Sequence, residues 1–330
     1  MNNGTGIRAA RLAAGAAVAA MFVAPVAANA ETKLKWAHVY EASEPYHTCA
    51  VAASEPLMAA TDGRYSIEVF PASSLGKETD INEGLGLGTV DIIYTGQSFA
   101  GSFYGPIAIG GAPFMFRDFD HWNAYRNSDL FKDLSEGYAD ASGNHIKAYT
   151  YYGGRHVTSN KPILTPEDMQ GLKIRVPNSP LYMMFPRATG ANPTPIAFAE
   201  VYLALQQGTV DAQENPLPTI QAKKFHEVQS DINLTGHITD ALLTIVGGPA
   251  WESIDAADQE ALTGVLQDAA VCATDQIIAK EAEMVEWFRA EGNNVNEVDR
   301  GPFIEATKKV HNGDMATWDQ ETYDRLQALK

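Results

Sequence analysis

Arg175 stands inside an apolar run, between Ile174 and Val176, where the pattern predicts a strand. A guanidinium is costly to bury unless an anion or a strong acceptor meets it. Its rigid fork matches a carboxylate through two parallel hydrogen bonds, which is the chemistry of organic-acid recognition. An internal salt bridge or a solvent-facing place on a sheet edge is the alternative, and the residue alone favours neither.

Two further polar residues stand at breaks in the chain. Arg155 follows Gly153 and Gly154, a pair that we interpret as a crossing between domains. Alone, Arg155 is more typical of a surface charge than of a ligand contact. Asn215 precedes Pro216, which ends a strand and holds Asn215 extended, so its amide is free to donate and accept. A turn-forming asparagine is the alternative.

One motif occurs twice. Gly-Thr-Val-Asp, at residues 88–91 and 208–211, ends a helix-like run and begins a strand-like one. Thr95 and Gln97 follow the first of these strands, as Asn215 follows the second. Ligands of open α/β sheets bind beyond the carboxyl ends of the strands, so two such halves facing each other would enclose one site. The repeat therefore predicts a clamshell that binds a solute.

Other polar residues lie past the ends of the earlier predicted strands. Tyr40, Glu41 and His47 follow the first strand, and Lys77 follows the second. Ordinary loop and helix-start positions are the alternative, but at the mouth of a sheet these side chains would meet ligand hydroxyls. Phe198 offers a face for stacking on a sugar, although a core position is the safer interpretation of an aromatic residue.

The rest of the chain alternates strand-like and helix-like runs, which predicts an α/β fold with a doubly wound sheet. Strands are expected over residues 34–39, 65–70, 90–94, 145–152, 174–176 and 195–196, and helices over residues 45–61, 77–87, 180–189 and 199–207. A long helix is expected over residues 255–292, where an apolar stripe at three- and four-residue steps is typical of core packing.

The N-terminus predicts export. Arg8 and Arg11 precede an alanine-rich apolar run, and Ala28-Asn-Ala30 is typical of a signal-peptide cleavage site. A transmembrane anchor is the alternative, but the run is short for one. We expect residues 1–30 to be removed and the protein to be periplasmic, without a lipid anchor because no cysteine stands at the cleavage point.

Charge and cysteine content exclude several classes. The formal net charge of −17 falls by two to −19 when Arg8 and Arg11 leave, which argues against nucleic acid or an anionic membrane as partner. Cys49 and Cys272 are too few for a disulfide framework and are not spaced as metal ligands. Export permits one bridge, but two buried free thiols are the alternative that we favour.

Three stretches carry a family resemblance: Gly-Leu-Lys-Ile-Arg-Val-Pro at residues 171–177, residues 195–216, and the loop over residues 70–76. They resemble the substrate-binding proteins of tripartite ATP-independent periplasmic (TRAP) transporters, the DctP type, over essentially the whole mature chain. The resemblance implies that Arg175 clamps the ligand carboxylate, that Arg155 supports it and that Asn215 completes the cradle.

The resemblance also implies a two-domain periplasmic-binding-protein clamshell, each domain a mixed or parallel sheet flanked by helices, with a long helix bracing both. We expect one domain over residues 31–152 plus about 241–282, and the other over residues 153–240 plus about 283–330. The ligand cleft lies between them. The expected partner is a TRAP membrane permease, and a monomer is the default.

The ligand is predicted from residues 38–47 and 151–161, which are similar to the branch of the family that takes hexuronates such as galacturonate or glucuronate. A sugar acid needs one carboxylate clamp and several partners for its hydroxyls, and the chain offers Glu41, His47, Lys77, Gln97 and Asn215. A simple dicarboxylate would need more cations, and an aromatic acid a drier pocket. Another carboxylate, such as a keto acid, an aldonate or an aromatic acid, is the alternative ligand.

An enzyme is the rival class. The sequence has no G-x-S-x-G elbow, no H-E-x-x-H, no Walker loop and no G-x-G-x-x-G after a strand. The eight histidines are scattered, and we predict neither a metal site nor a cofactor. A periplasmic uronate-converting lyase or isomerase is therefore poorly supported. A binding module that feeds a sensor is a third alternative.

Overall fold

The computed structural model describes residues 1–3 and 31–330. Residues 4–30, on which the predicted signal peptide falls, lie outside the described residues. Within the described ranges, no helix combines the length and the apolar character needed to cross a bilayer. Residues 31–330 form one unit built around a single sheet.

The sheet has nine strands in the order β2-β1-β3-β8-β4-β7-β5-β6, with β9 paired to β8. Their bounds are β1 Thr32–Ala37, β2 Tyr65–Phe70, β3 Ile92–Gly96, β4 His145–Ser159, β5 Lys173–Val176, β6 Asn192–Pro195, β7 Ala212–Pro216, β8 Asp231–Val246 and β9 Asn294–Asn296. The sheet is mixed, because β3 and β4 pair with β8, and β7 with β4, in antiparallel register.

The two copies of Gly-Thr-Val-Asp occupy equivalent places in the two halves of the sheet. In one half β1 pairs in parallel with β2 and β3, and in the other β5 pairs in parallel with β6 and β7. The aspartate side chain of each motif accepts a hydrogen bond from the backbone of the neighbouring strand. Asp91 Oδ2 accepts from the amide of Lys35 at 2.8 Å, and Asp211 Oδ2 accepts from the amide of Lys173 at 3.0 Å. The motif therefore fixes the start of β3 and of β7.

The two longest strands, β4 and β8, run antiparallel to each other through both halves. The predicted strand over residues 145–152 continues through Gly153 and Gly154 to Ser159, so the glycine pair lies inside β4, at a register shift. A Cβ at Gly153 would lie 2.7 Å from Glu281 Oε1 and 2.8 Å from Pro216 Cβ, so only glycine fits there. The sequence did not predict β8.

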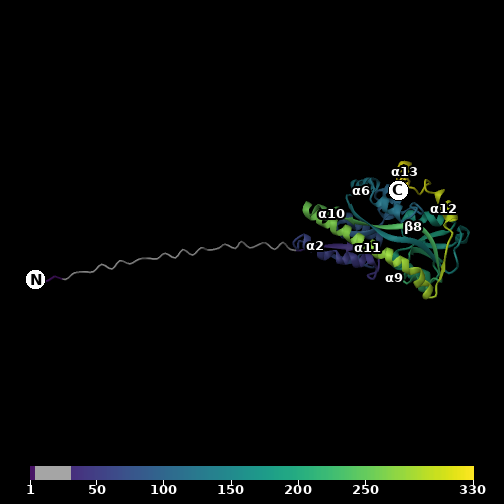
Figure 1. Ribbon diagram of the computed structural model, residues 1–330, viewed down its shortest axis with the longest axis horizontal. Coiled ribbons are helices and arrows are strands. Elements are labelled where there is room, and N and C mark those ends of the chain that lie inside the picture. The colour runs from purple at the N-terminus through teal and green to yellow at the C-terminus, as the bar shows by residue number, and fades with distance from the viewer. Residues whose placement is uncertain (4–30) are drawn as a thin grey trace. The chain divides into compact units, whose positions relative to one another are not determined.

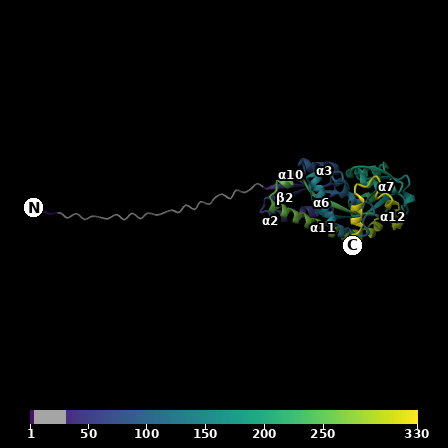
Figure 2. The ribbon, with the colours of Figure 1, turned by 90° about the horizontal axis from the view of Figure 1, so that it is seen from above.

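Helices cover the faces of the sheet (Figures 1 and 2). The predicted helix over residues 45–61 is two helices, and the one over residues 180–189 begins as a 3-10 turn. The helices are α1 Pro45–Ala52, α2 Ser54–Ala60, α3 Glu78–Leu87, α4 Gln97–Ala100, α5 Phe119–Arg126, α6 Asp129–Ser142, α7 Met184–Ala188, α8 Val201–Gln206, α9 Leu217–Ala222, α10 Gly248–Glu252, α11 Ala256–Ala290, α12 Arg300–Lys308 and α13 Gln320–Gln327.

Helix α11, 35 residues long, confirms the predicted long helix. It runs from α2 at one end of the molecule to α9 at the other and packs on β4 between them (Figure 1). Its first part contributes Leu266 and Ile277 to the core of the first half, and its last part contributes Met284 and Phe288 to a core of the second. One helix thus braces both halves.

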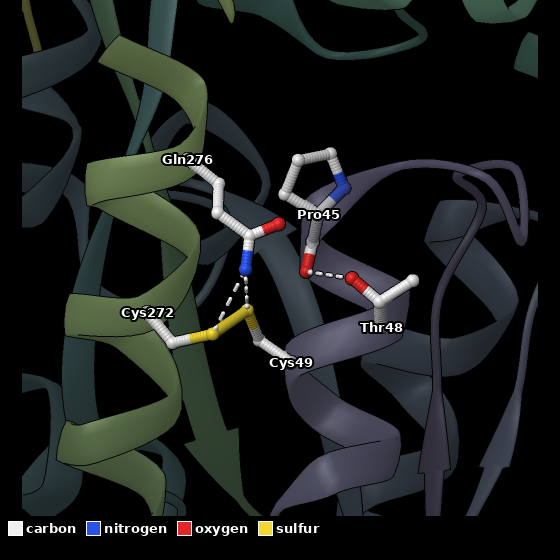
Figure 3. The surroundings of a disulfide bond; sticks show 5 residues. All are labelled: Pro45, Thr48, Cys49, Cys272 and Gln276. Carbon is white, nitrogen blue, oxygen red and sulfur yellow. Dashed lines mark hydrogen bonds between the residues drawn. A yellow bond between two sulfur atoms is a disulfide. The ribbon is translucent and has the colours of Figure 1, made fainter. Parts of the chain in front are cut away.

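Cys49 and Cys272 form a disulfide that joins α1 to α11 (Figure 3). The favoured prediction of two free thiols is therefore wrong. The two Cα atoms lie 6.0 Å apart, within the normal range for a bridge. Gln276 Nε2 donates to both sulfur atoms, at 3.3 and 3.2 Å. The pairing follows from the packing of α1 on α11, which the sequence spacing did not reveal.

Helix α13 lies against the first half of the chain. Arg325 pairs with Asp133 of α6 at 2.6 Å, and the guanidinium of Arg117 donates to the carbonyls of Gln327 and Leu329. The last helix, which belongs to the residues 283–330 that we predict for the second domain, thus also contacts the first half.

Candidate functional site

Two adjoining cavities lie where the strands of the two halves end. The first is lined by Val39, Tyr40, Glu78, Tyr152, Arg155, Arg175, Pro177, Tyr182, Phe198 and Asn215. The second shares some of these residues and adds Lys77, Thr79, Phe99, Asn178 and Ala197. Each has a volume of about 20 Å³, close to the space that one water molecule needs. The walls must therefore move apart before a larger solute can enter.

Arg175 lines both cavities and is almost fully buried. Nε and Nη2 donate to the carbonyl of Ile196 at 3.0 and 2.8 Å, while Nη1 is buried without a hydrogen-bond partner among the described residues. None of the salt bridges in that part of the chain includes Arg175. Burial lowers the pKa of Arg175 to about 10, so it stays cationic at neutral pH. The arrangement leaves one anchored cation with a donor free for an anion.

Arg155, in contrast, is fully engaged by the protein. Nε and Nη2 bind the carboxylate of Glu214 at 2.5 and 2.8 Å, and Nη1 lies 2.8 Å from Asp240 Oδ2. Burial opposes the charge, but these two carboxylates hold the pKa of Arg155 well above its usual value. Burial would likewise raise the pKa of Glu214, but Arg155 overrides it and lowers this pKa to about 2. Arg155 lines the cavity as part of a buried ion-pair network.

Asn215 is held by its neighbours at the wall of the first cavity. Its Oδ1 accepts from Tyr152 Oη and from Arg155 Nη2, both at 3.3 Å. Its Nδ2 donates to Gln213 Oε1 at 2.6 Å. The amide is thus oriented by protein groups, and the long bonds to Oδ1 leave that oxygen weakly engaged.

Three other predicted residues also lie at the cavities. Tyr40 and Phe198 come from opposite halves, with ring centroids 6.1 Å apart. The centroid of the Phe198 ring also lies 5.6 Å from the guanidinium carbon of Arg175. Lys77, exposed at the N-cap of α3, lines the second cavity. These residues and Arg175 meet although they are far apart in the sequence.

The remaining three predicted residues do not line either cavity. Glu41 pairs with Lys223 at 2.6 Å, and His47 Nδ1 lies 3.2 Å from His38 Nε2. Gln97 is fully buried and its side chain lies against Gly110. Because α4 begins at Gln97, its side chain turns into the core rather than toward the strand end.

Glu78 is a cavity residue that the sequence reasoning missed. It begins α3, and its Oε1 accepts from the amide of Gly96 at 2.9 Å and from Thr95 Oγ1 at 3.1 Å. Oε2 accepts no hydrogen bond from the described residues. Burial raises the pKa of Glu78 to about 7. Its place beside Lys77, at a helix start beyond a strand, was the available signal. Tyr152, Pro177 and Tyr182 were missed as well.

The profile of the family described as bacterial extracellular solute-binding protein, family 7 (DctP), matches residues 36–317. This chain belongs to that family. The solute-binding protein is 34% identical over 279 residues to a solute-binding protein of Roseobacter denitrificans, covering 84% of this chain and 85% of that one. It is 32% identical over 288 residues to the sialic acid-binding periplasmic protein SiaP of Vibrio cholerae, covering 87% and 90%.

Solved structures of TRAP periplasmic solute-binding proteins share the fold. The protein of Polaromonas sp. JS666 bound to D-erythronate is 32% identical, with a TM-score of 0.86 over 91% of this chain and 99% of that one. The R. denitrificans protein with L-galactonate is 31% identical, with a TM-score of 0.84 over 90% and 97%. The Citrobacter koseri protein with D-glucuronate is 25% identical, with a TM-score of 0.86 over 91% and 100%.

These findings confirm the predicted family and the predicted clamshell of a mixed sheet flanked by helices. The family and the neighbours are substrate-binding transport proteins, so this solute-binding protein is not an enzyme. The family works in the periplasm.

Proposed function

We propose that the protein captures a sugar acid, first of all the hexuronates D-galacturonate and D-glucuronate, and delivers it to a TRAP membrane permease. The observation that carries this proposal is that Arg175 lines both cavities and that its Nη1 is a buried cationic donor that no described residue meets. A carboxylate is the ligand group that best satisfies such a donor. We expect export by removal of residues 1–30 and action as a monomer.

Hydroxyl recognition is supported by the rest of the wall. Glu78 Oε2 accepts no hydrogen bond from the described residues, and the hydroxyl of Tyr182 makes none with them either. Phe198 adds an aromatic face beside Arg175. A buried guanidinium that has no carboxylate partner among the described residues, set among acceptors, hydroxyls and a ring, fits a carboxylate at one end of a polyhydroxylated ligand.

Aldonates are the second candidate. The neighbours with bound D-erythronate and L-galactonate are 32% and 31% identical to this chain, against 25% for the neighbour with D-glucuronate. Aldonates carry the same carboxylate and hydroxyls, but in an open chain. The clamp by Arg175 applies to both classes.

Capture requires the two halves to move, since each cavity is smaller than a sugar acid. Buried contacts between the two halves support a closing motion. Ser98 Oγ lies 2.6 Å from Ser179 Oγ, and Thr219 Oγ1 donates to Glu44 Oε1 at 2.7 Å. A ligand that touches both halves shifts the population toward the closed state, which the permease would recognise.

The experiment is a thermal-shift screen followed by calorimetry. The ligands are D-galacturonate, D-glucuronate, L-galactonate and D-erythronate, with the neutral sugars D-galactose and D-glucose as controls for the carboxylate. A ligand at a hundredfold excess over Kd stabilises the folded state by about 2.7 kcal/mol. We expect a shift with at least one acid and none with the neutral sugars.

Two variants complete the experiment. Arg175→Ala should weaken binding by a factor of tens to about a thousand, because it removes the cation that meets the carboxylate. Arg187→Ala, at an exposed arginine of α7, is the matched control and should bind as the wild type does. Wild-type affinity in Arg175→Ala, or equal binding of acid and neutral sugar, would overturn the proposal.

A further inference from the structure

Glu78 lies in the same two cavities as Arg175, but it comes from the other half of the sheet. It starts α3, which follows β2, whereas Arg175 belongs to β5. The amide of Gly96 and the hydroxyl of Thr95 both bind Oε1, which fixes the carboxylate. The second oxygen, Oε2, receives no donor from the described residues. Glu78 is thus a positioned acceptor on the wall of both cavities.

The charges around the cavities leave no second buried cation for a ligand. Arg155 is already paired with Glu214 and Asp240, so this group of three carries one positive and two negative charges. Arg175 is the one buried guanidinium of the cavity wall that is left without a carboxylate partner in the described ranges. Once a ligand carboxylate neutralises Arg175, the remaining buried charge around the cavities is negative, because it comes from Glu78 and from the group formed by Arg155, Glu214 and Asp240.

A second carboxylate on the ligand would therefore meet Glu78 without a buried cation to balance it. Burying an unpaired charge is costly, and a like charge nearby adds to the cost. A ligand hydroxyl has the opposite effect, because it can donate to Oε2. The site therefore favours a carboxylate at Arg175 and a hydroxyl at Glu78.

We propose that Glu78 determines specificity by accepting a ligand hydroxyl and excluding a second carboxylate, so that the site takes monocarboxylic sugar acids and rejects the corresponding diacids. This inference rests on the proposed function and names its substrate class more narrowly. The exposed Lys77 at the rim of the second cavity is the group that could instead take a second carboxylate.

The test compares two pairs of acids by calorimetry: galactonate with galactarate, and gluconate with glucarate. Within each pair the terminal CH2OH of the first is a carboxylate in the second, and the rest of the chain is the same. The wild type should prefer the monoacid by about tenfold or more. Glu78→Gln keeps an acceptor oxygen but removes the charge. The ratio of the affinity for the monoacid to the affinity for the diacid should therefore fall by about tenfold. Glu83→Gln, exposed on the same helix, is the control and should keep the wild-type ratio.

A second measurement needs no variant. The ratio in the wild type should increase from pH 5.5 to pH 8, because Glu78, with its pKa near 7, loses its proton in this range. Arg175 and Arg155 stay cationic, and Glu214 stays anionic, across these pH values. The other titratable groups around Glu78 are Asp240, held against Arg155, the phenols of Tyr40 and Tyr182, whose pKa values are raised, and Lys77.

The outcomes separate this inference from the proposed function. If diacids bind as well as monoacids, and neither Glu78→Gln nor pH changes the ratio, the inference is wrong while the proposed function stands. If Lys77→Gln abolishes diacid binding in such a protein, the second carboxylate binds at the rim. If no sugar acid binds the wild type at any pH, both proposals are overturned.

Discussion

Glu41 and Lys223 form an ion pair of 2.6 Å that joins the loop after β1 to the end of α9. The two residues belong to opposite halves of the sheet. The ammonium of Lys223 also lies 4.9 Å from the centroid of the Phe198 ring, which lines both cavities. The pair thus connects the halves beside the cavity, so that Glu41 acts on the closed state without lining the cavity itself.

The first prediction concerns this pair. Lys223→Ala should weaken ligand binding by up to about fivefold, since a partly exposed ion pair contributes about 0.2–1 kcal/mol to the closed state. Calorimetry measures the affinity, and small-angle scattering should show a larger unliganded molecule. Lys224→Ala, at the neighbouring exposed lysine, is the control. An unchanged affinity in Lys223→Ala would show that this ion pair does not stabilise the closed state.

The second prediction separates the two arginines of the site. Arg155→Ala leaves the buried Glu214 and Asp240 without their cation, so it should lower the free energy of unfolding by about 3–5 kcal/mol. Arg175→Ala removes a charge that no carboxylate of the described residues meets, so its cost in stability should be much smaller. Urea unfolding of both variants without ligand checks this. Equal losses in the two variants would contradict the division into a structural arginine and a ligand-binding one.

The third prediction concerns the pH dependence of stability. Burial raises the pKa of Glu44 from 4.5 to about 7. Between these values the unfolded chain has lost the proton while the folded protein keeps it, so the contribution of Glu44 to the free energy of unfolding should fall as pH rises from 4.5 to 7. Glu78 acts in the same direction, whereas His38 and His156, whose pKa values burial lowers to about 3, act in the opposite one.

Urea unfolding between pH 5 and pH 8 measures this slope. Glu44→Gln cannot ionise, so the free energy of unfolding of the wild type minus that of the variant should fall as pH rises through this range. Glu55→Gln, in the first turn of α2, serves as the control. A difference between the wild type and Glu44→Gln that stays constant from pH 5 to pH 8 would show that Glu44 has an ordinary pKa.

The fourth prediction concerns the disulfide. Its reduction, or replacement of Cys49 and Cys272 by serine, should lower the free energy of unfolding by about 2–4 kcal/mol, because the bridge closes a long loop. Denaturation with and without a reductant measures the effect, and the double variant should not respond to the reductant. If the oxidised and reduced proteins unfold at the same denaturant concentration, the bridge does not stabilise the fold.

Local signals carried the prediction of the fold. The repeat at residues 88–91 and 208–211 predicted two equivalent halves, and Asp91 and Asp211 show why, since each clamps the start of a neighbouring strand. The strand β8 was missed because its pairing with β3 and β4 is long-range and antiparallel. Long-range pairing leaves little trace in local periodicity.

Site residues could be predicted where a charged side chain stands inside a single apolar element. Arg175 was recognisable because it interrupts an apolar strand, whereas Glu78 begins an exposed-looking helix and is half-buried at the cavity wall. Gln97 seemed equivalent to Asn215, but the two side chains turn differently at their strand ends. The pairing of Cys49 with Cys272 likewise depends on how two distant helices pack.

A crystal structure of the protein with the tightest-binding sugar acid from the screen would test the central claim most directly. The account predicts a ligand carboxylate oxygen about 2.7–2.9 Å from Arg175 Nη1, with the ligand hydroxyls toward Glu78. A carboxylate bound to another cation, with Arg175 Nη1 not contacting the ligand, would contradict it.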